Sequence, residues 1–306
     1  MLTSILLTLL FNNVLFFIEN KRGLKIPRNM VYGWGIIAMV LTGILMYSTH
    51  LSVSILSILI TGVVGTIINL VVQENLELQK VYTKSLLIIF LFFFSSFFQI
   101  IPVLIFQIDL DHASLLTESY LSLFSQIVLI FIILAMYWKE LREELHIFSK
   151  DKMKNMDTGF KYWFLGFIVM MISNLLIAFL LPKAIAGNEE TVQEIIKASP
   201  WISLISTGIL APFIEEIVFR KAFRNMIPND TLFILISGTI FGGLHVVLSL
   251  SSFYDLAYLI PYCSLGIAFG FIYAKTKTVF TSFIMHAFHN FALTLLSIAS
   301  TLVILC

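Results

Sequence analysis

Charged residues are scarce in this sequence, and their scarcity limits the class of protein that it encodes. Only 12% of the 306 residues are Asp, Glu, Lys or Arg, whereas about a quarter of a soluble domain is charged. The net charge is +1, so no excess of basic residues favours a nucleic-acid partner. The two cysteines, Cys263 and Cys306, form neither a disulfide framework nor a CxxC metal pair. These absences argue against a soluble domain and a nucleic-acid-binding protein.

Long apolar segments, by contrast, are abundant in the sequence. Hydrophobic residues make up 59% of the chain and the mean hydropathy is +0.97. Apolar runs of about 18 residues or more recur, and each is long enough to cross a bilayer core of about 30 Å. Backbone groups in lipid must bond to one another, which helices achieve, and the runs lack the alternation of barrel strands. We therefore predict an all-α, polytopic transmembrane helix bundle of about ten spans, near residues 2–18, 30–47, 51–73, 84–106, 121–138, 162–182, 201–220, 232–250, 256–274 and 279–305.

The basic residues predict an orientation in the membrane. Lys and Arg number 17 in the odd-numbered loops and 2 in the even-numbered loops, so the odd-numbered loops are expected in the cytoplasm and both termini outside. Lys21 and Arg22 follow the first apolar run rather than precede it, which predicts a retained span instead of a signal peptide. We expect an integral protein of the bacterial cytoplasmic membrane.

The longest charged stretch, residues 139–161, predicts a domain boundary. It carries Glu140 and Glu144 at i, i+4 on a plausible short helix, and we interpret it as a cytoplasmic connector rather than a docking site. The boundary divides the chain into an N-terminal transmembrane bundle with this connector, residues 1–160, and a C-terminal domain, residues 161–306.

Ionisable side chains inside the predicted spans are confined to the C-terminal third. Of the 18 acidic residues, 16 fall in predicted loops or at their edges, and the other two are Glu215 and Glu216. The histidines within spans are His245, His286 and His289. Because a charge at bilayer depth costs roughly 3 kcal/mol or more, such groups must be paired or functional.

Helical spacing separates the two glutamates. Glu216 and Arg220 are i, i+4 and share a face, so they should form an ion pair, whereas Glu215 points about 100° away and is free to face a cavity. His286 and Asn290 are also i, i+4 and should face the same interior space. A carboxylate and an imidazole that converge on a water form a general base. An imidazole beside a carboxamide provides donors for an oxyanion.

The predicted depth of His245 fits this picture poorly. At 1.5 Å per residue, Glu215 lies about 7 Å and His286 about 10 Å from the cytoplasmic ends of their spans, but His245 lies about 20 Å away. We attribute the mismatch to the boundary or the tilt of the eighth span. Phe241 lies one turn before His245, and Gly242 and Gly243 between them would let another helix approach.

These groups form three ordered motifs: Glu215-Glu216-x-x-x-Arg220, Phe241-x-x-x-His245 and His286-x-x-x-Asn290. Together they resemble the motifs of the CAAX-protease and bacteriocin-processing (CPBP, or Abi) family of intramembrane endopeptidases, over roughly residues 200–295. The resemblance implies that Glu215 and His245 activate the attacking water and that His286 and Asn290 stabilise the oxyanion. Glu216, Arg220 and Phe241 would be supporting residues.

The resemblance favours a metal-free mechanism without a cofactor. Zinc held by Glu215, His245 and His286 is the alternative, since these are zinc-ligand types. The expected substrate is a membrane-associated peptide or protein in the lipid bilayer. Prenylated CAAX termini, signal-peptide remnants, pheromones and bacteriocin leaders all fit.

Two other classes of function remain open. A catalytically idle relative would act as a scaffold or a bacteriocin-immunity protein, for example with a sensor kinase or a pheromone as its partner. A proton-coupled transporter would use Glu215 and the histidines as a relay, but the first six predicted spans lack polar residues to line a path. For Glu216 and Arg220, a purely structural ion pair is as well supported as a catalytic role. His289 is expected to be a packing residue.

Overall fold

The structure is a computed structural model that describes residues 2–22, 26–48, 55–72, 75–181, 187–247 and 253–305. Every regular element in these ranges is a helix, so the all-α prediction is confirmed. Within these ranges, eight helices are long and apolar enough to cross a membrane, or nine if one bent pair is counted as a single span. The chain is therefore an integral membrane protein, and the count agrees roughly with the predicted ten. His50, predicted in a loop, lies outside the described residues.

The chain forms two compact units, Met1–Leu91 and Phe92–Cys306. The first contains α1 (Leu2–Arg22), α2 (Arg28–Ser48), α3 (Ile55–Val72) and most of α4 (Leu76–Phe93). Buried amides join α1 to α3, since Asn12 Nδ2 donates to the carbonyl of Gly62 and Asn69 Nδ2 donates to the carbonyl of Asn12. Inside a membrane, an apolar side chain is as stable against lipid as against another helix. Interhelical hydrogen bonds and close packing at small residues therefore hold the helices together.

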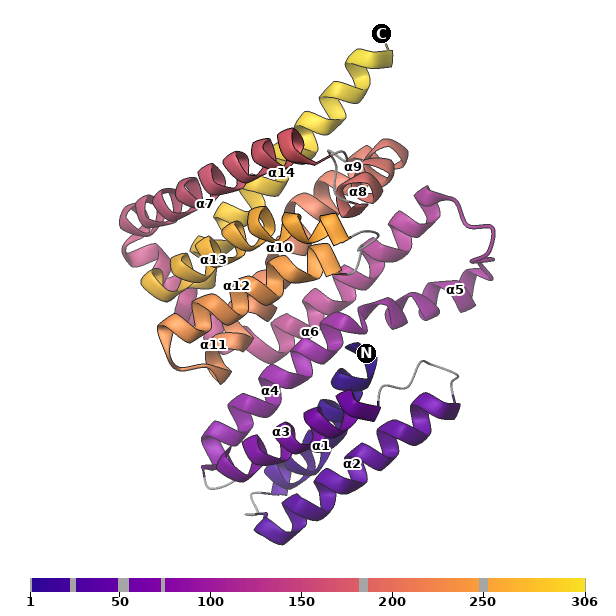
Figure 1. Cartoon of the computed structure of the whole chain (residues 1–306), viewed down its shortest axis with the longest axis vertical. Helices are drawn as coiled ribbons and strands as arrows, with labels where there is room; N and C mark the ends of the chain where they lie inside the picture. The colour runs from indigo at the N-terminus through magenta and orange to yellow at the C-terminus, as the bar shows by residue number, and fades with distance from the viewer. Residues whose placement is uncertain are drawn as a thin grey trace. The chain divides into compact units, whose positions relative to one another are not determined.

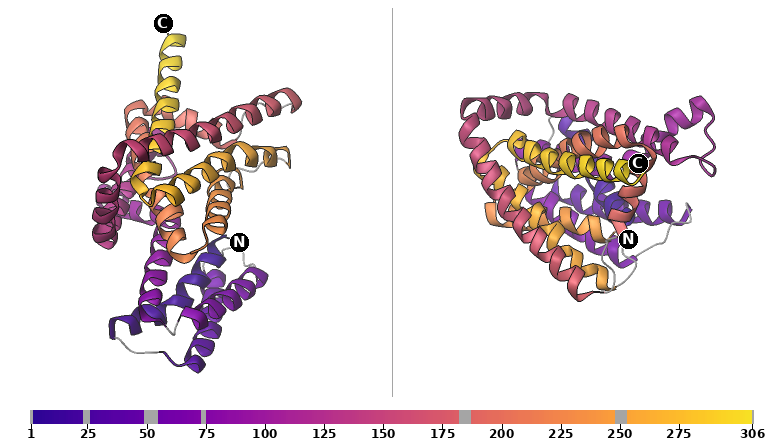
Figure 2. Two further views of the ribbon diagram at one scale, coloured as in Figure 1. Left: turned by 90° about the vertical axis from the view of Figure 1, so that its left-hand side faces the viewer. Right: turned by 90° about the horizontal axis from the view of Figure 1, so that it is seen from above.

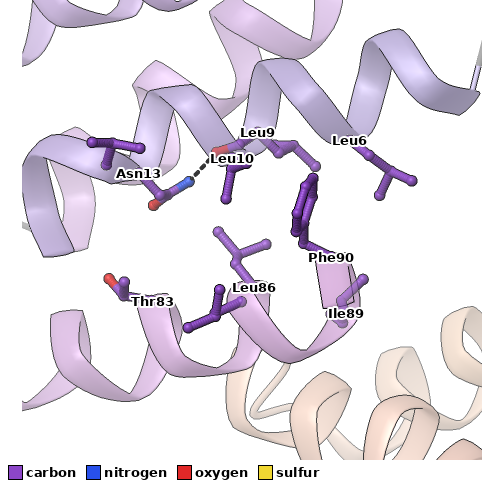
Figure 3. A pocket seen from close by; sticks show the side chains of 10 residues that line it. Leu6, Leu9, Leu10, Asn13, Thr83, Leu86, Ile89 and Phe90 are labelled. Carbon is purple, nitrogen blue, oxygen red and sulfur yellow. Dashed lines mark hydrogen bonds between the residues drawn. The ribbon is translucent and has the colours of Figure 1, made fainter. Parts of the chain in front are cut away.

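An apolar cavity of about 130 Å³ lies between α1 and α4 in the first unit. Figure 3 shows the leucines of α1 facing Leu86 and Phe90 of α4 across it. Asn13 is the polar residue on the α1 side, and its Nδ2 donates to the carbonyl of Leu9. None of the three sequence motifs contributes to this cavity.

The second unit carries all three motifs. Its helices are the 3₁₀ turn η1 (Ser95–Gln99), α5 (Ile100–Phe106), α6 (Leu115–Lys150), α7 (Lys152–Leu180), α8 (Gly187–Ala198), α9 (Pro200–Ile205), η2 (Ser206–Leu210), α10 (Ala211–Glu216), η3 (Ile217–Ala222), α11 (Phe223–Met226), α12 (Asp230–Val247), η4 (Phe253–Tyr258), α13 (Leu259–Thr276) and α14 (Val279–Leu305). The predicted span 84–106 is broken after Phe93, where the Ser95-Ser96 pair enters a 3₁₀ turn. Serine side chains compete for backbone hydrogen bonds and so favour such breaks.

Helices α7, α12 and α13 pack side by side, with α13 between the other two (Figure 1). Figure 2 shows α7 and α13 running alongside each other from a second direction. The close approach of α12 to α13 depends on Gly242, where a Cβ atom would lie 2.4 Å from the backbone nitrogen of Cys263. The predicted close approach is thus confirmed at Gly242, whereas a Cβ atom at Gly243 would meet nothing within 4 Å.

The charged stretch 139–161 joins two long helices and does not form the short helix of its own that the sequence predicted. It continues α6 to Lys150 and begins α7 at Lys152, and within it Glu144 is only 5% exposed. The two compact units divide at Leu91, because α6 packs against α10 and α14 within the second unit. A compact unit and a functional domain need not coincide, so the functional boundary near residue 160 stays a prediction.

Candidate active site

The paired glutamates lie on one long helix, Pro200–Met226, which contains two π-helical segments. In the first, the N–H of Ala211 donates to the carbonyl of Ser206, an i to i+5 bond. The next acceptor in this register is the carbonyl of Thr207, and its donor would be residue 212, a proline that has no N–H. π-Helical turns of this kind are frequent at functional sites.

Glu216 and Arg220 form the predicted ion pair. Arg220 Nε lies 3.1 Å from Glu216 Oε2, and both side chains are fully buried. The guanidinium also lies over the ring of Phe241, 5.0 Å from its centroid, and donates from Nη1 to Ser237 Oγ at 3.4 Å. Buried charges are tolerated only when they are paired and hydrogen-bonded, as here.

His286 lies between the two glutamates. Its Nδ1 is 3.0 Å from Glu216 Oε1, and its Nε2 is 3.6 Å from Glu215 Oε2. An ionised carboxylate only accepts, so Nδ1 carries the proton and donates it to Glu216. The ring is stacked on Phe269, 4.6 Å between centroids, and is edge-on to Phe241 at 5.4 Å. Nε2 is thereby directed to Glu215, at a distance slightly longer than a direct hydrogen bond.

Glu215 faces a cavity, as its position on the helix predicted. Its side chain is 18% exposed, and it lines a space of about 290 Å³ in the second unit. The adjacent carboxylates therefore differ: one is neutralised by Arg220 and held by His286, and the other faces the cavity.

The residues of η1 and α6 that line this cavity show that one expectation from the sequence was wrong. We expected the first six spans to lack polar residues that could line a path, but η1 and α6 line this cavity with hydroxyl and amide groups: Ser95, Ser96, Gln99, Ser122, Ser125 and Gln126. A search for ionisable groups missed them because they are uncharged. Their detectable signal is the helical spacing of residues 122, 125, 126 and 129 on α6, which marks one face.

His245 is joined to the site through Phe241. Its Nδ1 lies 2.9 Å from the carbonyl of Phe241, and its ring is 4.9 Å from the Phe241 ring and stacked on Tyr262 at 5.2 Å. Because a carbonyl only accepts, Nδ1 is the protonated nitrogen of this ring. The Phe241 ring contacts both His245 and His286.

The depth mismatch of His245 came from the seventh span, not the eighth. Helix α12 begins at Asp230, close to the predicted 232, but the helix before it continues to Met226 rather than ending at 220. Measured from Met226, Glu215 lies about 16 Å along its helix, and from Asp230, His245 lies about 22 Å along α12. The difference falls from about 13 Å to about 6 Å, roughly one helical turn.

Asn290 and His289 lie on α14 with different surroundings. Asn290 Nδ2 donates to the carbonyl of Thr207 at 3.1 Å. His289 is buried, with its ring edge-on to Trp163 at 6.4 Å and to Phe167 at 6.1 Å, as expected for a packing residue.

Glu144 of α6 is a buried carboxylate whose burial and partners the sequence analysis did not predict. It accepts from Lys221 Nζ in a short ion pair, from Tyr273 Oη at 3.1 Å and from the backbone N–H of Val279 at 2.7 Å. A carboxylate at the first residue of α14 is favoured by the helix dipole. Glu144 therefore joins the helix of the paired glutamates to α13 and to the start of α14. No local signal marks its burial, since the two residues before it, Arg142 and Glu143, are charged and exposed.

Metal binding at Glu215, His245 and His286 stays an alternative without geometric support. Within the described part of the chain, no group of three His, Cys, Asp or Glu side chains converges closely enough to hold an ion. His286 uses Nδ1 for Glu216 and has only Nε2 left for any ligand bond. The metal-free mechanism remains a prediction.

Residues 197–292 match the family model described as type II CAAX prenyl endopeptidase Rce1-like. The match confirms, for this CPBP segment, the predicted resemblance to the CAAX-protease and bacteriocin-processing family. The CPBP segment contains all three motifs, and α6 with Glu144 lies before it.

Two curated bacterial proteins are similar to the chain. The putative membrane peptidase YdiL of Bacillus subtilis (strain 168) is 33% identical over 106 residues, which are 34% of this chain and 40% of YdiL. The UPF0177 protein YxdF of Lactococcus lactis subsp. lactis (strain IL1403) is 26% identical over 149 residues, 47% of this chain and 80% of YxdF. The chain thus spans less than half the length of YdiL. No solved structure matches the chain significantly.

Proposed function

We propose that the chain is an intramembrane endopeptidase that hydrolyses a peptide bond of a membrane-associated protein or peptide. The observation that carries the proposal is the separation of two adjacent glutamates: Glu216 is tied to Arg220 and His286, and Glu215 lines a cavity with Nε2 of His286 3.6 Å away. The CPBP segment and the name of the relative YdiL support the same class of activity.

In the proposed reaction, Glu215 takes a proton from a water that attacks the scissile carbonyl carbon. His245 assists this transfer or the later movement of the proton. The tetrahedral intermediate then collapses as Glu215 returns the proton to the amide nitrogen and the C–N bond breaks. The products are a carboxylic acid, which then passes its proton to solvent, and an amine, and no covalent enzyme intermediate forms.

The oxyanion is stabilised by His286, with Asn290 as the second donor. Because His286 Nδ1–H is donated to Glu216, Nε2 donates to an oxyanion only when the ring is the imidazolium. With His286 as the imidazolium, Glu215 and Glu216 contribute two negative charges, and Arg220 and His286 contribute two positive ones. The resting site is then neutral, which suits a membrane interior.

Cleavage by the purified full-length protein tests the proposal. A membrane-embedded peptide library is incubated in detergent with wild type, Glu215→Gln and His245→Ala, each with and without a strong zinc chelator. Glu118→Gln, an exposed carboxylate on α6, is the matched control. Wild type and the control should cut, the two site variants should lose at least about a hundredfold in rate, and the chelator should change nothing. Loss of wild-type activity in the presence of the chelator would support the zinc-dependent mechanism instead.

An absence of cleavage together with wild-type behaviour of Glu215→Gln in cells would replace the protease by a scaffold or immunity protein. A pH-dependent ion flux without a cleavage product would instead support a transporter.

We also propose the bacterial cytoplasmic membrane, with the odd-numbered loops in the cytoplasm. The two relatives are bacterial, and basic residues cluster where the seventh and ninth loops meet: Arg224 Nη1 and Lys277 Nζ lie 2.6 and 3.6 Å from Asp230 Oδ1. Labelling of an introduced cysteine at Asn229 from the cytoplasmic side alone would support this orientation. A peptide pheromone or a sensor kinase is a proposed partner that pull-down from the native membrane would test.

A further inference from the structure

One wall of the cavity beside Glu215 is built by residues that the CPBP segment 197–292 does not contain. They come from η1 and α6, two elements that pack against each other. On α6 the lining residues follow at i, i+3, i+4 and i+7, so one continuous face of the helix is turned to the cavity: Ser122, Ser125, Gln126 and Leu129.

The polar groups of this wall are uncharged. Apart from Glu215, they are hydroxyls and carboxamides, and none of the residues that line the cavity is Lys or Arg. Two of the groups already have partners, since Ser125 Oγ donates to the carbonyl of Leu121 and Gln126 Oε1 accepts from Ser206. The amide N–H groups of Gln126 are donors that a bound ligand can use. Within the described residues, no intramolecular hydrogen bond uses the side chains of Ser95, Ser96, Gln99 and Ser122.

An extended polypeptide suits such a wall. A segment that is unwound for cleavage inside a membrane exposes N–H and C=O groups that need partners, because lipid supplies none. Serine hydroxyls and glutamine amides both donate and accept, so they satisfy either kind of backbone group. The two glutamines come from different elements, η1 and α6, and Glu215 is on α10. A peptide in the cavity is therefore surrounded by hydrogen-bonding groups while its carbonyl is within reach of the carboxylate.

Two other occupants fit less well. An acyl or isoprenoid chain would cover the hydroxyls and amides without giving them partners, which is unfavourable in a dry interior. A free carboxylate would face Glu215 without a basic side chain to balance it, and like charges at short distance repel. The cavity volume of about 290 Å³, at roughly 30 Å³ per water, equals about ten waters. It accommodates a short peptide stretch with small side chains.

We propose that this cavity is a substrate subsite, which rests on the proposed endopeptidase function. It binds an internal, uncharged stretch of the substrate with small side chains, directly beside the scissile bond, through the uncharged groups of η1 and α6. The lipid-embedded or lipid-modified part of the substrate lies elsewhere. The subsite selects by backbone hydrogen bonding and rejects acidic residues and a free carboxyl terminus.

Kinetics of the full-length enzyme test the subsite. Ser122→Ala and Gln99→Leu remove hydrogen-bonding groups without adding bulk, and Ser149→Ala makes the same change as the first at an exposed position of the same helix. The substrates are two peptides that differ only in Ser or Asp beside the scissile bond. Each cavity variant should raise KM for the Ser peptide about three- to tenfold with kcat nearly unchanged. The Ser149 variant should match wild type, and wild type should discriminate against the Asp peptide.

Photo-crosslinking adds a measurement that does not depend on turnover. Glu215→Gln protein is mixed either with a benzophenone-bearing peptide or with a benzophenone-bearing acyl chain, and the labelled residues are mapped by mass spectrometry. The peptide should label η1 and α6 around Ser96 and Ser122, and Ser122→Phe, which fills the cavity, should abolish this label.

The outcomes separate the subsite from the catalytic proposal. Cleavage with unchanged KM in both cavity variants would overturn the subsite and leave the endopeptidase standing. Labelling of the cavity by the acyl chain instead of the peptide would overturn it in favour of a lipid site. Peptide labelling in the cavity without any cleavage by wild type would retain the subsite and reject the endopeptidase. Neither labelling nor cleavage would reject both.

Discussion

The carboxamide of Asn290 donates to the carbonyl of Thr207, the one acceptor that Pro212 leaves without its π-helical backbone donor. Asn290 thereby connects α14, which carries His286, to the helix that carries the two glutamates. The amide keeps a second N–H that can reach an oxyanion, so a positioning role and a donor role are both compatible with its contacts.

A double substitution distinguishes these two roles. Asn290→Ala should lower kcat at least about tenfold. Pro212→Ala restores a backbone N–H that can bond to the Thr207 carbonyl, so the double variant Asn290→Ala/Pro212→Ala should recover most of the rate if Asn290 only positions the helix. The readout is kcat with a cleavable membrane peptide. A double variant that stays as slow as Asn290→Ala would assign the lost rate to the oxyanion.

Arg220 should be more important for folding than for the reaction itself. Arg220→Met leaves Glu216 charged in a fully buried position and is expected to lower the free energy of unfolding by about 3–5 kcal/mol. Glu216→Gln/Arg220→Met removes both charges and should recover part of this loss. Unfolding in detergent micelles, followed by circular dichroism, measures the difference. Equal stability of the single and double variants would contradict a buried pair.

Glu144 should stabilise the protein although it lies outside the matched segment. Glu144→Ala removes the partner of Lys221, of Tyr273 and of the Val279 N–H, and a loss of roughly 3 kcal/mol in unfolding free energy is expected. Glu144→Gln keeps one carbonyl oxygen and should lose less. The neighbour Glu143 is exposed, so Glu143→Ala should stay within about 0.5 kcal/mol of wild type. Equal losses of unfolding free energy in Glu144→Ala and Glu143→Ala would show that the contacts of Glu144 do not specifically stabilise the protein.

The adjacent glycines of α12 provide a matched pair of variants. A Cβ atom on Gly242 would lie 2.4 Å from the backbone of Cys263, whereas one on Gly243 would meet nothing within 4 Å. Gly242→Ala should therefore destabilise by about 1–3 kcal/mol and displace Phe241 and His245 from α13. Gly243→Ala should be neutral or stabilise by up to about 1 kcal/mol, because alanine favours a helix. Thermal unfolding and cleavage rate are compared, and a neutral Gly242→Ala would contradict the close packing.

The class of the protein and the positions of its acids followed from the sequence alone, because both depend on local properties. Hydropathy over about 20 residues identifies a helix that can cross a bilayer, and the i, i+4 spacing of Glu216 and Arg220 places both on one face. The break after Phe93 and the π-helical segments shift local geometry by a residue or two, which sequence spacing does not resolve.

Tertiary structure decided the surroundings of those residues. His286 lies 70 residues from Glu216 in sequence and Glu144 lies 135 residues from Val279, so their meeting depends on how helices pack and not on any local pattern. The uncharged wall of the cavity was invisible to a search for charges and becomes recognisable only where η1, α6 and α10 converge. Helical periodicity shows which face a side chain lies on, but the packing of distant helices determines what that face meets.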